Sequence, residues 1–107
     1  MKRIALLLPL AALLVGADLD PPGTEIVVAF SRLRFEPATI EIRRGARVTF
    51  HNMDTGDGAY TVVASDGEFE SRPLATHGEW SYRFETRGEH EYFVKEHPET
   101  KGRAVVR

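Results

Sequence analysis

The stretch that decides the fold is Glu79-Trp80-Ser81-Tyr82-Arg83-Phe84-Glu85. Large aromatic side chains alternate in it with charged or small polar ones. After a turn at Gly88, residues His90, Tyr92 and Val94 repeat the same spacing. Side chains two residues apart share one face of a β-strand, so both runs predict strands with one face in an apolar core.

The same alternation extends through most of the chain. Further strands are expected at residues 24–30, 39–43, 47–51, 60–64 and 104–106. Turn residues such as Gly45 and Gly67 separate them. No segment shows the 3.6-residue period of an amphipathic helix, and only residues 70–77 leave room for a short helical turn. The pattern predicts an all-β fold, a Greek-key β-sandwich of seven or eight strands.

The first residues do not follow this pattern. Lys2 and Arg3 precede an apolar run that ends in small residues at Ala17. This layout is typical of a secretory signal peptide, and the run is too short to span a bilayer. We therefore expect a signal peptide at residues 1–17, a linker at 18–23 and one domain at 24–107. Such a protein is expected to be periplasmic or secreted, with no membrane span after signal cleavage.

The composition excludes several kinds of chemistry. The 107 residues include no cysteine, which excludes disulfides, thiol nucleophiles, iron–sulfur clusters and thiolate zinc sites. Stability must then come from an apolar core, and apolar residues make up 42% of the chain. The formal net charge is −2 and no basic stripe is present, so nucleic acid is not expected as a partner.

Two segments carry a resemblance to a known family. The first is Phe35-Glu36-Pro37-Ala38-Thr39-Ile40-Glu41-Ile42, followed by Gly45 and Val48-Thr49-Phe50-His51-Asn52. The second is Tyr92-Phe93-Val94-Lys95-Glu96-His97-Pro98-Glu99-Thr100-Lys101-Gly102. Together they resemble the small cupredoxins, the amicyanin- and plastocyanin-like blue copper proteins, over about residues 24 to 107. The second segment is similar to the copper loop of that family, Tyr-x-Cys-x-x-His-Pro-x-Met-x-Gly. The resemblance implies a cupredoxin fold and an ancestry in electron transfer.

The resemblance also implies a type-1 copper site built from two His, one Cys and an axial Met. Only His97 matches one of these ligand positions. Tyr60 stands at the first His position, Val94 at the Cys position and Thr100 at the Met position. Val94 has no lone pair for a metal, and a neutral hydroxyl suits Cu(I) poorly. With three of four ligand positions substituted, the electron-transfer mechanism is not available in the form that the family uses.

The remaining histidines leave a different metal site open. His97 is expected at the end of the sandwich, with the carboxylates of Glu96 and Glu99 beside it. His90 falls on the inward face of its strand, so His97 and His90 with a carboxylate could hold Cu(II) or Zn(II). The other interpretation makes His97 a solvent-edge residue and His90 a hydrogen-bonded interior one.

Other chemistry-bearing groups are interpreted as surface features. His51 alternates to the solvent side of its strand and His77 falls in a loop. Glu68 and Glu70 share a strand face, and exposed charges of this kind discourage edge-to-edge pairing. The arginines around Gly45 are interpreted as a solvated hairpin tip.

These observations favour one function and leave an alternative. The leading hypothesis is an exported cupredoxin-like domain with a degenerate copper site, which binds a protein partner at the His97 end of the sandwich and needs no cofactor. The alternative is a copper-binding protein that uses a non-standard site centred on His97. Neither hypothesis makes the protein an enzyme.

Overall fold

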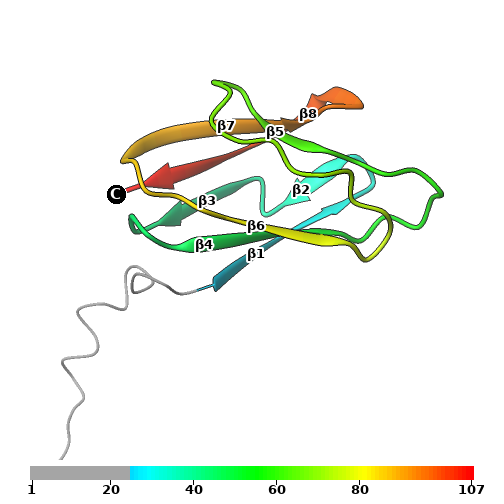
Figure 1. Cartoon of the computed structure of the whole chain (residues 1–107), viewed down its shortest axis with the longest axis horizontal. Coiled ribbons are helices and arrows are strands. Elements are labelled where there is room, and N and C mark those ends of the chain that lie inside the picture. Colours follow the sequence, from blue (N-terminus) through cyan, green and yellow to red (C-terminus); the bar gives the residue numbers. More distant parts are fainter. Residues whose placement is uncertain (1–24) are drawn as a thin grey trace, which may run out of the picture.

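The computed structural model describes residues 25–107 and shows two four-stranded sheets packed face to face (Figure 1). One sheet has the strand order β2-β1-β4-β6 and the other the order β3-β8-β7-β5. The predicted signal peptide and linker lie outside the described residues. The strands are β1 (Glu25–Ser31), β2 (Arg34–Glu36), β3 (Thr39–Ile42), β4 (Arg47–Asn52), β5 (Val62–Ala64), β6 (Glu79–Arg83), β7 (Gly88–Val94) and β8 (His97–Val106).

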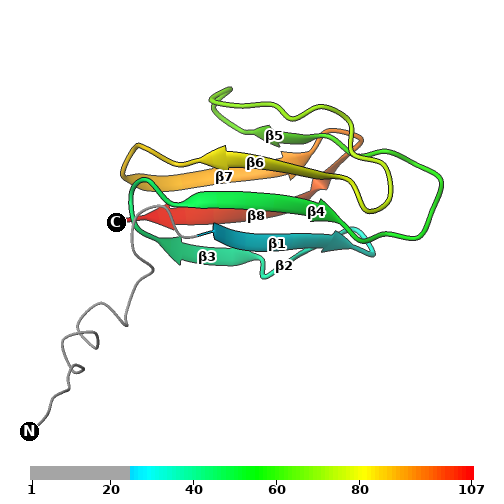
Figure 2. The same ribbon diagram turned by 60° about the horizontal axis from the view of Figure 1, so that its bottom comes forward.

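The chain passes repeatedly from one sheet to the other. It changes sheet after β2 and then at every connection up to β7, and only β1–β2 and β7–β8 are hairpins within a sheet. Two pairs are parallel, β1 with β4 and β3 with β8. The turn between β7 and β8 lies at the opposite end of the sandwich from the C-terminus (Figures 1 and 2). The prediction of an all-β sandwich of seven or eight strands is confirmed.

Three local expectations differ from the structure. Residues 70–77 form no helical turn, because Glu70 and Leu74 make β-bridges to Val63 and Tyr60. The Ser71 amide donates to the Val62 carbonyl and the Leu74 amide to the Tyr60 carbonyl, so these groups are not available for helical hydrogen bonds. Strand β8 begins at His97 and not at residue 104, and β2 was not expected.

Within the described residues, no helix is long and apolar enough to cross a bilayer.

The core lies between the sheets and is mainly aromatic at its centre. Phe50 of β4 is 1% exposed, and its ring lies 5.0 Å from that of Tyr92 and 6.2 Å from those of Phe35 and Phe69. Buried aliphatic side chains from both sheets belong to the same core. The alternation that predicts the strands also explains this core, because it sends every second side chain inward.

Gly102 makes room for one of these rings. It lies opposite Tyr92 in the β7–β8 register, and a Cβ atom at residue 102 would lie 2.7 Å from Cε1 of Tyr92. A side chain at residue 102 would therefore displace the ring from the core.

The Tyr92 hydroxyl is buried and has no hydrogen-bond partner among the described residues. Burial raises the pKa of Tyr92 well above its usual range. An unpaired buried hydroxyl costs free energy, so Tyr92→Phe is expected to stabilise the fold by about 1 kcal/mol, measured by urea unfolding. Tyr82→Phe is the matched control: it removes a hydroxyl that donates to Glu68 and is expected to destabilise. A loss of stability in Tyr92→Phe would contradict the prediction and point to a buried water on that hydroxyl.

Candidate functional site

The positions predicted to correspond to copper ligands gather at one end of the sandwich, which we call the His97 end. Val94 closes β7 and pairs with His97, the first residue of β8, across a turn formed by Lys95 and Glu96. The Tyr60 ring lies 5.6 Å from the His97 ring. Thr100 follows on β8 and is buried. The structure therefore places Tyr60, Val94 and His97 next to one another, with Thr100 three residues further along β8.

Their side chains are engaged in packing and internal hydrogen bonds. Val94 is fully buried in the core. The Thr100 hydroxyl donates to the Leu33 carbonyl at 3.1 Å. Tyr60 lies between His97 and Phe30, whose ring centroid is 4.7 Å away. Of this group, His97 alone offers an imidazole, and its side chain is 38% exposed.

The β7–β8 turn is tied to the strand beside it. The Glu96 carboxylate accepts hydrogen bonds from the Thr61 amide at 2.8 Å and the Thr61 hydroxyl at 2.9 Å. The Lys95 amide donates to the Thr61 carbonyl at 2.8 Å. Partial burial opposes the charged form of Glu96, but the hydrogen bonds from Thr61 and the charge of Lys95 outweigh it and hold the pKa of Glu96 below its usual value. The turn that the sequence predicts to correspond to a copper loop is thus closed by a carboxylate.

Glu96→Gln is expected to destabilise the fold by about 1 kcal/mol at neutral pH, because the amide side chain has one acceptor oxygen for the two Thr61 donors. The loss is small because water screens this exposed group. The folded pKa of Glu96 is lowered, so its contribution is present above the unfolded pKa and is lost as pH falls through the folded pKa. Thermal melts of the natural protein and the variant should therefore differ near pH 7 and converge in acid. Glu99→Gln, which removes an exposed carboxylate 3.8 Å from His97, should change little. A constant difference between Glu96→Gln and the natural protein at all pH values would contradict this account.

The structure does not bring His90 and His97 together. His90 lies four residues before Val94 on β7, about 13 Å along the strand at the usual rise. Its Nδ1 is 2.8 Å from Oε1 of Glu68 and its Nε2 is 2.7 Å from the Thr86 carbonyl. Of the two carboxylates expected near His97, Glu99 lies 3.8 Å from its Nδ1, whereas Glu96 is bound to Thr61. A site that combines His97 and His90 is therefore not assembled.

The structure brings together two groupings of polar side chains that the sequence does not predict. One joins Asp66, Glu68 and His90, and the other places the His51 and His77 rings 6.4 Å apart. Strand alternation tells which side of a strand a residue occupies but not which distant strand covers it. No signal in the sequence could therefore have paired Glu68 with His90.

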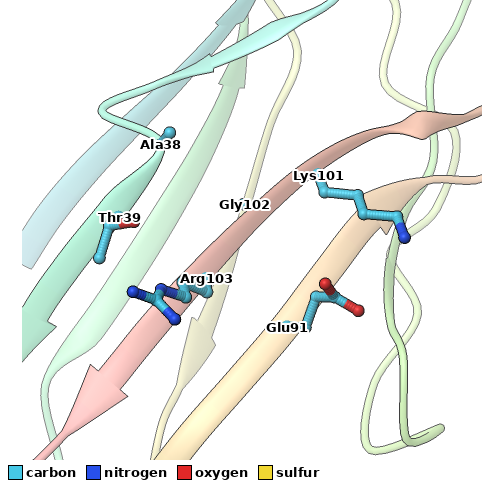
Figure 3. Close-up of a pocket in the computed structure, with 6 residues that line it drawn as sticks. All are labelled: Ala38, Thr39, Glu91, Lys101, Gly102 and Arg103. Carbon is cyan, nitrogen blue, oxygen red and sulfur yellow. The ribbon is translucent and has the colours of Figure 1, made fainter.

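A shallow hollow lies along the middle of β8, next to the His97 end. Figure 3 shows it around Gly102, lined by Lys101 and Arg103 of β8, Glu91 of β7, Thr39 of β3 and Ala38 just before it. It includes none of the positions 60, 94 and 100. The hollow is therefore separate from the candidate site.

Comparison with solved structures gives a clear result for the fold. An oxidized methionine-to-leucine mutant of amicyanin is 22% identical with a TM-score of 0.70, over 77% of this chain and 81% of that chain. The purple cupredoxin from Nitrosopumilus maritimus is 24% identical with a TM-score of 0.66, over 78% of this chain and 99% of that chain. This chain has the cupredoxin fold. A Cu(I) form of a methionine-to-alanine mutant of amicyanin, 22% identical with a TM-score of 0.69, matches over 86% of this chain and 89% of that chain.

No protein-family model matches the sequence, and the search of curated proteins found no match. The expected resemblance to the small cupredoxins is supported through the fold.

Proposed function

We propose that this chain is an exported cupredoxin-like domain whose type-1 copper site has degenerated, and that it acts as a binding module and not as an electron carrier. The proposal depends on one observation: the side chains at all three substituted positions are used in packing or in a hydrogen bond within the fold. Val94 is core, Thr100 bonds Leu33, and Tyr60 packs between aromatic rings. A side chain already committed to packing offers a metal no open coordination position.

The surface at the His97 end supports a protein partner. Leu33 and Met53 are 42% and 41% exposed, and they are two of the three exposed large hydrophobic residues of the described chain. Leu33 is tied to Thr100, and the Met53 amide donates to the Phe30 carbonyl next to Tyr60. Exposed apolar side chains on segments bonded to this end suit a partner surface that is partly apolar.

Metal titration tests the loss of the copper site. Protein purified from the natural host is expected to carry no stoichiometric copper, and its thermal midpoint should not change with a copper-selective chelator, because a bound copper ion would have raised it. Stoichiometric copper that is reversibly reduced would overturn the proposal. Export is tested in the same preparation, since cleavage after Ala17 leaves Asp18 as the N-terminal residue.

Crosslinking tests the partner surface. A photocrosslinking residue at position 53 is expected to capture a specific partner in the host, whereas the same residue at position 87, in the β6–β7 turn at the opposite end, should not. Equal capture from both positions, or none from position 53, would count against a docking surface at the His97 end.

A copper-binding role centred on His97 is the alternative. It is favoured by the exposed imidazole, with Tyr60 beside it and a Glu99 carboxylate oxygen 3.8 Å away. In that case His97→Ala would abolish Cu(II) binding, and binding would weaken in acid because the ligand must be neutral. Cu(II) binding that survives His97→Ala would remove this alternative.

A further inference from the structure

Asp66, Glu68 and His90 form a cluster of metal-ligating side chains far from the His97 end. One ligand atom of each lies within 4.8 Å of the others. Asp66 and Glu68 belong to the turn after β5, and His90 lies on β7. Asp66 is exposed, Glu68 is partly buried and the His90 side chain is 7% exposed. The cluster therefore opens to solvent on its Asp66 side and is closed on its His90 side.

Both ring nitrogens of the buried His90 face acceptors. Its Nε2 lies 2.7 Å from the Thr86 carbonyl, which can only accept, so Nε2 carries the proton. A neutral ring then has its lone pair on Nδ1, and this lone pair points at the Glu68 carboxylate 2.8 Å away. The Nδ1 lone pair and the Glu68 oxygen are both acceptors, and two acceptors in contact repel each other where water is largely excluded. A cation between them, a metal ion or a second ring proton, removes this repulsion.

The surroundings of the cluster are those of a metal site. Metal-ligating histidines usually donate their other ring N–H to a carbonyl or carboxylate, as His90 does to Thr86. Ligating carboxylates are usually hydrogen-bonded as well, and the Tyr82 hydroxyl donates to Oε2 of Glu68. Burial, together with this hydrogen bond and the Glu68 charge, raises the pKa of Tyr82 to about 12, so the hydroxyl remains a donor.

We propose that Asp66, Glu68 and His90 bind a divalent transition-metal ion of the Zn(II) class. One imidazole nitrogen and two carboxylate oxygens suit Zn(II), which takes three protein ligands and a water in open sites. The imidazole disfavours Ca²⁺ and Mg²⁺, and the absence of sulfur disfavours Cu(I). Two ligand atoms of a tetrahedral zinc ion lie about 3.3 Å apart. Glu68 must therefore move about 0.5 Å from its present contact with His90, and the ligand atoms that now lie up to 4.8 Å apart must approach each other by about 1.5 Å, which the exposed Asp66 side chain allows. This site is independent of the proposed function and shares no residue with the His97 end.

Calorimetric titration with Zn(II) tests the site. The background is a double variant, His51→Ala with His77→Ala, because these two rings, one partly buried and one exposed, lie 6.4 Å apart and could bind zinc adventitiously. This protein is expected to bind one Zn(II). Adding Glu68→Gln or Asp66→Asn should weaken binding at least about 10-fold, and Tyr82→Phe, which removes only the support of Glu68, about 10-fold. Glu89→Gln, an exposed carboxylate on β7 paired with Arg103, is the matched control and should bind as before.

Three results would overturn the proposal. One is that no Zn(II) binds and NMR spectra show both ring nitrogens of His90 protonated. A proton alone would then lie between His90 and Glu68. Another is binding that is equal in Asp66→Asn, Glu68→Gln and the background protein, which would mean an adventitious ion only. The third is zinc binding that leaves the His90 ring resonances unshifted. Because the Asp66→Asn substitution is on an exposed side chain, it keeps the test interpretable if a variant at Glu68 fails to fold.

Discussion

A triple variant with Val94→Cys, Tyr60→His and Thr100→Met is expected to give intense thiolate-to-copper absorption when Cu(II) is added, whereas the natural protein gives none. The reason is positional. Position 94 is paired with His97, and the ring at position 60 lies 5.6 Å from the His97 ring. Two imidazoles, a thiolate and a thioether at one end of a β-sandwich form the donor set of a blue-copper site. The measurement is an absorption spectrum during Cu(II) titration.

The thiolate is the decisive member of that set. The double variant Tyr60→His with Thr100→Met is the matched control, since it restores the imidazole and the thioether and leaves Val94 in place. It is expected to bind Cu(II) weakly and without the intense band. If the triple variant binds copper and stays colourless, the turn held by Glu96 and Thr61 keeps position 94 away from the metal. Adding Glu96→Ala would release the turn and should then restore the band.

The strand pattern and the core could be predicted from the sequence because they depend on local spacing. Alternation at residues 79–85 and 90–94 predicts the inward faces of β6 and β7. Tyr92 on β7 and Phe84, directly after β6, are fully buried, and Trp80 and Tyr82 on β6 are partly buried. Burial in a two-layer sandwich follows from which side of a strand a residue occupies. Long-range pairing is not needed for that prediction.

Strand β2 and the hydrogen-bond partners of Glu96 and His90 could not be predicted, because they depend on contacts between distant segments. Strand β2 is three residues long, carries Arg34 and Glu36 at its ends, and exists because it pairs with β1. Glu96 reaches Thr61 across 35 positions of the sequence, and His90 meets Glu68 across 22. Such partners are fixed by how strands are ordered and stacked, which a single sequence does not reveal. The inward side of His90 could be predicted, but not that its ring is held far from His97.

Phe50→Ala is expected to destabilise the fold by about 3 to 5 kcal/mol, which is typical for truncating a buried phenylalanine. Phe50 is at the centre of the core, with rings of Phe35, Phe69, Trp80 and Tyr92 within 6.3 Å of its own. Both sheets contribute to this group, since Phe50 is on β4 and Tyr92 on β7. Removing the ring opens a cavity between the layers that these rigid neighbours cannot fill.

A loss of that size is a large part of the stability of a small domain, commonly about 5 to 15 kcal/mol, and the chain has no cysteine with which to form a compensating disulfide. Urea unfolding should therefore show a much lower midpoint with an unchanged slope. Val27→Ala, on the neighbouring strand β1 but 54% exposed, is the control and should shift stability by no more than about 0.5 kcal/mol. If Phe50→Ala cost as little as Val27→Ala, the aromatic group between the sheets would not be what holds the sandwich together.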